Sequence, residues 1–361
     1  MNREFQLGTY LSNGIDRIVK GAVKATLKYP KESAFLARFA LSVQKSKNLR
    51  DDAQARGEHV PPFLIASITS RCNLHCEGCY ARANNTCTDI ASTHSMDALQ
   101  WGRIFGEASE LGISFILLAG GEPLLRPDVL AEAAKYPQIL FPVFTNGTLL
   151  EKYIDLFDKH RHLVPMLSIE GNEQMTDTRR GTGVYHVLIS AMEKMKRRGI
   201  LFGVSVTVTK ENLHDATGSG FLNLLENQGC KVVVYVEFVP VDHRTKELAP
   251  GENERAYLKS RLDKLRLEDE GMVFISFPGD EKSSGGCLAA GRGFFHISVN
   301  GSAEPCPFSP YSDTSLQDTP LREALRSPLF MKLHEGNILI QNHDGGCVLY
   351  EQEDKVKELL G

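Results

Sequence analysis

The sequence has little that would place the protein in a membrane or on nucleic acid. Its 361 residues contain no apolar run near the roughly 18 residues that a spanning helix needs. Residues 1–14 lack the apolar core of a secretory signal peptide. The formal net charge of −4 gives no general attraction to nucleic acid, and the basic N-terminal stretch lacks aromatic stacking platforms. We therefore expect a cytoplasmic protein without a firm nucleic-acid signal.

The chain also lacks the features of repeat proteins and of disulfide-stapled scaffolds. No repeat of 20 to 50 residues is apparent, which argues against a solenoid. The chain is too long for a small disulfide framework, and three of its 8 cysteines crowd into one short segment. We expect reduced thiols that serve a site.

That segment contains Cys72, Cys76 and Cys79, separated by three and then two residues. Thiolates are soft ligands, and three of them on a compact loop suit an iron–sulfur cluster. A four-iron cluster with three local thiolates leaves one iron open to another ligand. A zinc site is the alternative, but it usually needs a fourth nearby Cys or His, and His75 is badly placed on the same tight loop.

The Cys-x3-Cys-x2-Cys spacing resembles the signature of the radical S-adenosylmethionine (radical SAM) superfamily. The resemblance implies a [4Fe–4S] cluster on Cys72, Cys76 and Cys79 whose open iron binds the amino and carboxylate groups of S-adenosylmethionine (SAM). It implies that an electron from the cluster cleaves SAM to a 5′-deoxyadenosyl radical, which abstracts hydrogen from a substrate. It further implies a reducing partner such as flavodoxin or ferredoxin.

From residue 61 onward, apolar β-rich runs alternate with longer amphipathic stretches, the pattern of βα units and a parallel sheet. The predicted strands are 63–68, 115–119, 141–145, 164–169, 202–208 and 231–239. The predicted helices are 97–111, 127–136, 149–161, 184–198, 220–229 and 252–270. Six units are two short of an eightfold barrel. We therefore predict an α/β fold with a partial (β/α)6 TIM-like barrel over residues 61–275.

Polar motifs follow the first four predicted strands, at the rim where parallel barrels place their chemistry. Gly120 and Gly121 allow close approach of the backbone to a ligand. Together with Glu122-Pro123 they resemble the family's Gly-Gly-Glu-Pro element, which contacts the methionine amino group of SAM.

The resemblance assigns further cofactor contacts to the same rim. Arg180 resembles the arginine that pairs with the SAM carboxylate, with the adjacent Arg179 as the alternative. Tyr80 is expected near the adenine, because Gly78 stands where relatives often carry an aromatic or histidine. The remaining expected contacts with the cofactor are Thr145, Asn146, Ser168, Glu170 and Asn212.

After residue 277 the composition shifts toward Gly, Pro and Cys. Cys287, Cys306 and the later Cys347 resemble the SPASM and twitch appendages that add an auxiliary iron–sulfur cluster to radical SAM enzymes. Residues 294–299, the turn Asn300-Gly301 and the next few residues predict a β-hairpin that presents Cys306. The resemblance implies a small α+β appendage over residues 276–361, with an auxiliary [4Fe–4S] cluster on these three cysteines.

The fourth ligand of that cluster is left open. Cys347 is followed by Val348, Leu349 and Tyr350, so the second cysteine of the usual Cys-x2-Cys pair is missing. Candidates for the fourth position are Cys87, Cys230, Tyr350, His343 or no protein ligand at all. The other interpretation of the three cysteines is a set of buried free thiols or a zinc site.

Residues 1–60 predict a helical extension. Apolar residues from Ile15 to Leu27 recur at helical spacing beside a lysine stripe, and residues 34–43 predict a second helix. We favour a helical hairpin docked on the main domain, with its lysines in water. The alternative is contact of residues 15–50 with an anionic membrane surface or an acidic partner.

These features predict a radical SAM enzyme of oxidoreductase or maturase type. The sequence does not identify its substrate, which we expect to be a small molecule or a peptide. The rival interpretation is a non-catalytic iron–sulfur electron carrier or scaffold on a barrel frame. That rival leaves the Gly-Gly-Glu-Pro element and Arg180 without a purpose.

Overall fold

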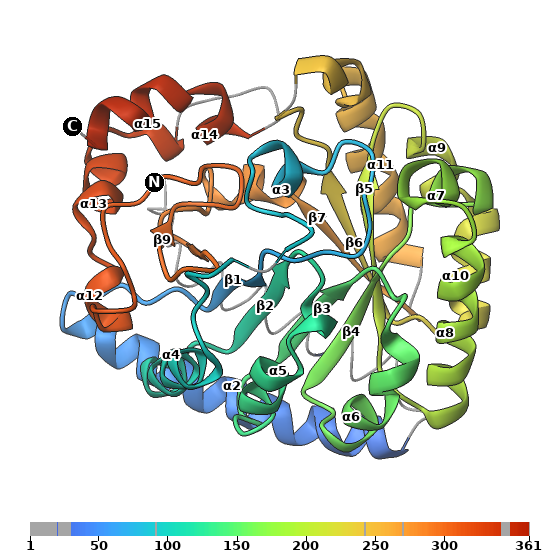
Figure 1. The fold of residues 1–361 in the computed structure, drawn as a ribbon, viewed down its shortest axis with the longest axis horizontal. Coiled ribbons are helices and arrows are strands. Elements are labelled where there is room, and N and C mark those ends of the chain that lie inside the picture. Colours follow the sequence, from blue (N-terminus) through green and yellow to red (C-terminus); the bar gives the residue numbers. More distant parts are fainter. Residues whose placement is uncertain are drawn as a thin grey trace.

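The computed structural model describes residue 20 and residues 30–90, 92–241, 243–268, 271–340 and 347–360. At its centre, parallel strands form a curved sheet with helices on its outer side (Figure 1). The strands of the barrel are β1 (Phe63–Thr69), β2 (Phe115–Gly120), β3 (Phe141–Thr145), β4 (Leu163–Ser168), β5 (Gly203–Val208), β6 (Val232–Glu237) and β7 (Val273–Phe277).

The order of the strands is β7-β6-β5-β4-β3-β2-β1-β8-β9. β8 (His296–Ile297) adds to β1 in parallel, and β9 (Ala303–Glu304) pairs with β8 in antiparallel fashion. Because β7 and β9 end the sheet on opposite sides, the barrel is open, which confirms the predicted partial barrel. The six predicted strands are right, but the prediction missed β7, a short apolar run at the expected end of the barrel domain.

Helices connect the strands over the outer face: α4 (Ala98–Leu111), α5 (Pro127–Ala133), α6 (Ile154–Lys159), α8 (Val184–Arg198), α10 (Ser219–Gln228) and α11 (Glu252–Glu268). Further helical elements are α3 (Tyr80–Ala83), α7 (Glu173–Arg180), α9 (Leu213–Ala216), η1 (Pro123–Leu125), η2 (Leu150–Tyr153), η3 (His243–Leu248), η4 (Gly279–Ser284) and η5 (Ile338–Ile340). The sequence defines the ends of α4: Asp97 and Gln100 form a capping box, and Gly112 ends the helix with φ 83°.

Alternate residues of each strand face opposite sides of the sheet. On β1, Leu64 and Ala66 are fully buried in the core shared with the outer helices. Ile65 and Ser67, on the inner face, are only half-buried. The inner face is thus the side that a substrate can reach.

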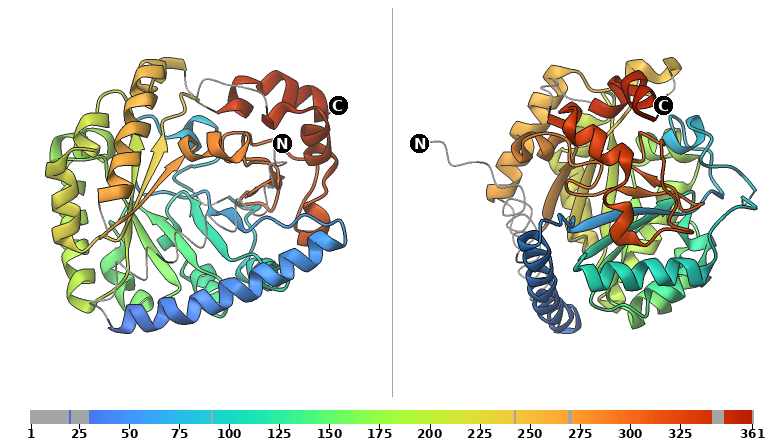
Figure 2. Two further views of the ribbon diagram at one scale, coloured as in Figure 1. Left: turned by 180° about the vertical axis from the view of Figure 1, so that it is seen from behind. Right: turned by 90° about the vertical axis from the view of Figure 1, so that its left-hand side faces the viewer.

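Helix α2 (Pro30–Ala55) runs beneath the barrel, across the end where the strands begin (Figures 1 and 2). Its residues Phe35 and Phe39 are buried against Val164 and Met166 of β4. The apolar side of α2 is therefore used in packing, and the bottom of the barrel is closed.

The N-terminal extension differs from its prediction. The helix expected over residues 34–43 extends from Pro30 to Ala55. The helix expected between residues 15 and 28 lies outside the described residues, apart from residue 20, so the membrane-surface contact of residues 15–50 stays a prediction. Among the described helices, none combines the length and the apolar character needed to cross a bilayer.

The C-terminal segment continues the sheet. The predicted hairpin is confirmed as β8–β9, with Gly301 in the left-handed region (φ 86°) between the strands. Helices α12 (Leu321–Ala324), α13 (Pro328–Glu335), α14 (Val348–Glu351) and α15 (Glu353–Leu360) follow. Barrel and appendage share one hydrophobic core, and the boundaries 1–60, 61–275 and 276–361 stay predictions.

Candidate active site

The first group of thiols lies on the loop that leaves the C-terminal end of β1. Backbone hydrogen bonds hold this loop: Cys72 N donates to Thr88 O at 3.1 Å, and Glu77 N donates to Arg179 O at 2.8 Å. Cys72, Cys76 and Cys79 are half-buried, and the charges of Cys72 and Cys79 act on the Cys76 thiol. The structure thus brings together the three thiols that the spacing singled out.

Cys72 favours its thiolate form. A hydrogen bond from the Cys87 thiol lowers the pKa of Cys72 to about 6, against the effect of burial, and the same contact raises the pKa of Cys87. For Cys76, burial outweighs the attraction of Arg180 and raises the pKa. Cys87 therefore lies beside the first group of thiols, and it is not placed to be the fourth ligand of the appendage cluster.

The two glycines at the end of β2, Gly120 and Gly121, allow the loop that follows β2 to touch the thiol loop. Gly121 N donates to Thr69 O at 2.7 Å, and a Cβ on Gly121 would lie 2.1 Å from Arg71 O. Gly120 has φ 119°, a conformation that favours glycine. Any larger residue would push the β2 loop away from Cys72.

Glu122 ties strand ends together. Its carboxylate accepts hydrogen bonds from Leu124 N (3.0 Å), Thr145 Oγ1 (2.7 Å) and Asn146 N (2.8 Å). Burial raises the pKa of Glu122 to about 7, despite these donors. Glu122 thus anchors the loops after β2 and β3, and its contact with the SAM amino group stays a prediction.

Asn146 connects the end of β3 to the thiol loop. Its side-chain amide donates to Asn73 Oδ1 at 2.9 Å and lies 4.0 Å from Cys72 Sγ. Since Asn73 directly follows Cys72, this contact orients the first ligand of the predicted cluster.

Glu170, just past β4, binds two arginines of α7. Arg179 Nη1 and Arg180 Nη2 each lie 2.5 Å from Glu170 Oε1. Burial alone would raise the pKa of Glu170, but the two guanidinium groups together lower it. Arg180 Nη1 also lies 3.9 Å from Cys76 Sγ. The charge of Arg179 also acts on Cys76, but of the two arginines Arg180 is the one with a side-chain contact to a thiol.

Two other predicted contacts lie close by. Ser168 is half-buried at the end of β4, in register with Ser205 of β5. The amide of Asn212 donates to the carbonyl oxygens of Glu170 (3.1 Å) and Thr207 (2.9 Å). Asn212 therefore fixes the ends of β4 and β5.

Tyr80 connects the thiol loop to the appendage. Its ring packs edge-on against Phe308, with 4.9 Å between the ring centroids, and burial raises the pKa of its hydroxyl. Phe308 also lines the pocket that contains the appendage cysteines. Tyr80 thus lies between the two groups of thiols, and its contact with adenine stays a prediction.

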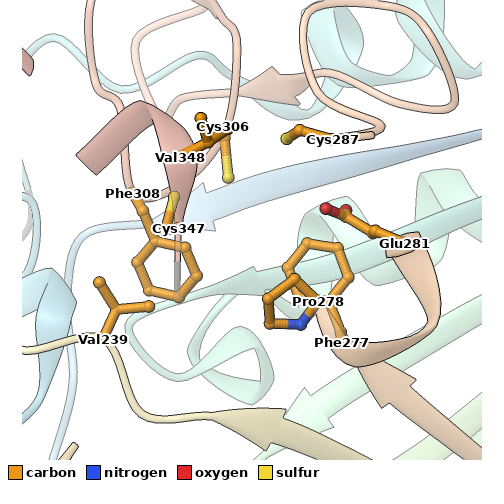
Figure 3. Close-up of a pocket in the computed structure, with 9 residues that line it drawn as sticks. All are labelled: Val239, Phe277, Pro278, Glu281, Cys287, Cys306, Phe308, Cys347 and Val348. Atoms are coloured by element: carbon orange, nitrogen blue, oxygen red, sulfur yellow. The ribbon is translucent and has the colours of Figure 1, made fainter. Parts of the chain in front are cut away.

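The second group of thiols comes from three separate segments. Cys287, Cys306 and Cys347 are all buried, and burial raises the pKa of Cys287 and Cys306. Their sulfur atoms line one pocket (Figure 3). The other residues that line it are Val239, Phe277, Pro278, Glu281, Phe308 and Val348.

Glu281 is the member of this pocket that the sequence did not indicate. It lies in a polar stretch that resembles an exposed loop, six residues before Cys287, and no motif marks it. In the structure its side chain is buried, and burial raises its pKa to about 8.

The candidates for the fourth ligand lie elsewhere or outside the described residues. The Tyr350 hydroxyl donates to Pro240 O at 2.6 Å. The Cys230 thiol bonds to Val232 O at the start of β6, the opposite end of that strand from the pocket. His343 is not among the described residues.

A further polar group, made of Ser67, His296 and Glu304, lies near the thiol loop. His296 Nε2 lies 2.7 Å from Ser67 Oγ, and His296 Nδ1 lies 2.7 Å from Glu304 Oε2. The charge of Glu304 acts on Tyr80, so this group lies close to the thiol loop. Sequence patterns missed it because its members come from β1, β8 and β9.

Both groups of thiols fit an iron–sulfur cluster by the chemistry of their donors. Among the residues that the structure describes, no three His, Cys, Asp or Glu side chains converge closely enough to hold a single metal ion. In a cubane, each thiolate binds a different iron, so the ligands of one cluster stay apart.

Comparison with known proteins identifies the family. Residues 66–218 match the Radical SAM superfamily. The AdoMet-dependent heme synthase of Methanosarcina barkeri is 28% identical over 307 residues, which cover 76% of this chain and 85% of that protein. The pre-heme d1 synthase of Dinoroseobacter shibae is 30% identical over 42% of this chain and 37% of its own length. The chain thus spans most of the first relative and little more than a third of the second.

Solved structures share the fold. Streptococcus suis SuiB bound to S-adenosylmethionine has a TM-score of 0.68 and 15% identity, covering 84% of this chain and 77% of that one. Native anSMEcpe with bound AdoMet has a TM-score of 0.60 and 17% identity, covering 78% and 85%. With the thiol loop at the end of β1 and the matched residues 66–218, the chain belongs to the radical SAM superfamily, whose enzymes use a [4Fe–4S] cluster and SAM.

Proposed function

We propose that the protein cleaves SAM at a [4Fe–4S] cluster on Cys72, Cys76 and Cys79 and removes hydrogen from a tetrapyrrole. The observation that supports this most is the approach of Arg180 Nη1 to within 3.9 Å of Cys76 Sγ, at the rim of an open barrel. A guanidinium beside the thiols is placed to bind the carboxylate of a ligand on the cluster. When bound, the cluster supplies the electron that cleaves SAM.

The surrounding residues position the cofactor. Glu170 holds the Arg180 guanidinium, and Asn146 orients the residue after Cys72. Gly121 lets the β2 loop approach the thiol loop without a side chain in between. Since α2 closes the opposite end of the barrel, substrate enters from the rim that carries the thiols.

The choice of a tetrapyrrole rests on the relatives. Three relatives by sequence are an AdoMet-dependent heme synthase, an Fe-coproporphyrin III synthase and a pre-heme d1 synthase. The similarity to the first spans 76% of this chain, well beyond the 66–218 core that the whole superfamily shares. Half-buried Ile65 and Phe277, with the polar His296 beside Ser67 on the inner face, suit a flat apolar ring with polar substituents.

We further propose that Cys287, Cys306 and Cys347 hold an auxiliary [4Fe–4S] cluster that accepts the electron left on the substrate, which makes the reaction an oxidation. Radical SAM enzymes need a reductant, and for this chain we propose flavodoxin or ferredoxin. Tyr80 and Phe308 separate the two clusters and exclude water between them.

The test is anaerobic reconstitution followed by incubation with SAM, dithionite and iron coproporphyrin III, a carboxylate-bearing porphyrin. We expect 5′-deoxyadenosine and a change in the mass of the porphyrin, and both should be lost in Cys76→Ala. Both should be kept in the control Cys230→Ala, because the Cys230 thiol lies at the start of β6, away from both groups of thiols. A loaded cluster that yields no 5′-deoxyadenosine would support the electron carrier or scaffold. Cleavage of SAM without any change in the porphyrin would overturn the tetrapyrrole and direct the search to peptides.

A further inference from the structure

Glu281 occupies a fixed place in the appendage. It lies on η4, directly after β7, where its backbone N donates to Pro278 O at 2.7 Å. The neighbouring Asp280 accepts hydrogen bonds from Ser276 N and Arg266 Nη2, both at 2.8 Å. The turn is thus attached to the barrel by Asp280, and only 5% of Glu281 is exposed.

The Glu281 carboxylate faces the second group of thiols. It accepts hydrogen bonds from the Cys287 thiol and from the Leu288 amide. Figure 3 shows the carboxylate and the sulfur atoms of Cys287, Cys306 and Cys347 around the same space. The four side chains come from η4, from the turn before β8, from the end of the hairpin and from the start of α14.

The chemistry of the pocket calls for a cation there. Apart from these four donors, the lining residues are apolar, and a carboxylate buried among apolar groups is costly unless a cation compensates its charge. Three thiolates leave one iron of a cubane without a protein ligand. An iron bound to the carboxylate would satisfy both needs at once, because carboxylate oxygen is an accepted ligand of iron.

We infer that Glu281 is the fourth protein ligand of the appendage cluster, bound through a carboxylate oxygen. The inference rests on the auxiliary cluster proposed above and adds its ligand set: Cys287, Cys306, Cys347 and Glu281. Cluster assembly would release the protons of the three thiols and of the carboxyl group to solvent. The appendage cluster is then closed to substrate, unlike the cluster of the thiol loop.

The test uses the full-length chain in which Cys72, Cys76 and Cys79 are replaced by Ala, so that the remaining iron belongs to the appendage. This parent and its variants are reconstituted anaerobically, and iron and sulfide are counted. Electron paramagnetic resonance (EPR) of the reduced cluster is then recorded with and without cyanide, a small ligand for an open iron. We expect about four irons in the parent and an EPR spectrum that cyanide does not change.

Three variants decide the role of Glu281. Glu281→Ala should open one iron, so that cyanide changes its EPR spectrum and brief exposure to air removes on the order of one iron in four. Glu281→Cys should keep the full iron content and stay insensitive to cyanide. Asp280→Asn is the matched control, because it alters a carboxylate on the same turn that does not face the thiols; it should behave like the parent.

The outcomes separate the two proposals. A parent without iron removes the auxiliary cluster, and the ligand set with it. A parent with about four irons, together with a Glu281→Ala variant that matches it in iron and in its response to cyanide, overturns Glu281 alone. Glu281→Gln guards against misfolding, because it preserves shape and can still accept hydrogen bonds. A parent-like response in this variant would show that Glu281 only accepts hydrogen bonds from Cys287 and Leu288.

Discussion

The two groups of thiols in this molecule differ in their surroundings. Cys72, Cys76 and Cys79 are half-buried and lie beside the cationic Arg180 and the polar Asn146. Cys287, Cys306 and Cys347 are buried among apolar side chains. The first group is built to admit a charged cofactor and the second to exclude one, although both offer three sulfur atoms.

A buried glutamate stands beside each group, and the two have different partners. Glu122 accepts hydrogen bonds from Leu124 N, Thr145 Oγ1 and Asn146 N, all of which belong to the frame of the barrel. Glu281 accepts one from a thiol that we assign to the cluster. The comparison shows that burial alone does not define a ligand; the partners do.

The largest expected effect comes from removing a cluster ligand from the open site, the group of Cys72, Cys76 and Cys79. Cys76→Ala removes a predicted cluster ligand, so formation of 5′-deoxyadenosine should fall by several orders of magnitude, to background. Cys306→Ala should instead leave cleavage of SAM in place and abolish turnover of the substrate. Liquid chromatography of 5′-deoxyadenosine and of product in the same reaction measures both. Equal loss of SAM cleavage in the two variants would contradict the division of tasks.

The second effect tests which arginine serves the open site. Arg180→Ala should raise KM for SAM by roughly 10- to 100-fold, because a charge-assisted hydrogen bond to the cofactor carboxylate is lost. Arg179→Ala is the matched control, since Arg179 binds the same Glu170 but its other side-chain hydrogen bond goes to Thr207 Oγ1 at 3.0 Å, whereas Arg180 approaches a thiol. Steady-state kinetics at varied SAM concentration measures both. A larger KM effect in Arg179→Ala would reverse the assignment.

The frame that carries the open site could be predicted from the sequence. The strands are continuous apolar runs, and the polar motifs follow them at once, so their meeting at one rim is a matter of topology. The hairpin before Cys306 was predicted from Asn300-Gly301, a local turn signal. Apolar runs, the polar motifs that follow them and turn signals can be recognised from one sequence alone.

Contacts between distant segments could not be predicted. Cys87 lies beside Cys72 because the segment after α3 returns to the thiol loop, where Thr88 N donates to Ser70 O at 2.7 Å. Glu281 approaches Cys287 only because β7 joins the sheet and directs η4 inward, and β7 itself was missed. Neither position has a pattern of its own, since burial in the folded state gives each residue its role.

A smaller effect should come from exposing the closed site, the group of Cys287, Cys306 and Cys347, to water. Phe308 separates its thiols from the Tyr80 ring, so Phe308→Ala exposes the pocket to water. Removing this half-buried ring should cost about 2 kcal/mol of stability and speed the loss of appendage iron in air a few-fold. Iron retention is compared in two backgrounds, one without Cys72, Cys76 and Cys79 and one without Cys287, Cys306 and Cys347. Equal acceleration in both backgrounds would mean that the two sites are not separately sealed.

The smallest effect concerns Glu122, whose pKa burial raises to about 7 from 4.5. The folded state holds this proton more tightly than the unfolded state, so the stabilising contribution is complete below pH 4.5 and is lost as the pH rises toward 7. The full change is at most about 3 kcal/mol. In Glu122→Gln this pH dependence should vanish, while iron content stays that of the wild type. Urea unfolding of both proteins between pH 5 and 8 measures their stabilities. As the pH rises, the wild type should lose stability relative to Glu122→Gln, because only the wild type gives up this proton. A difference in stability that does not change with pH would show that Glu122 is ionised throughout, and that the two buried glutamates are less alike than their burial suggests.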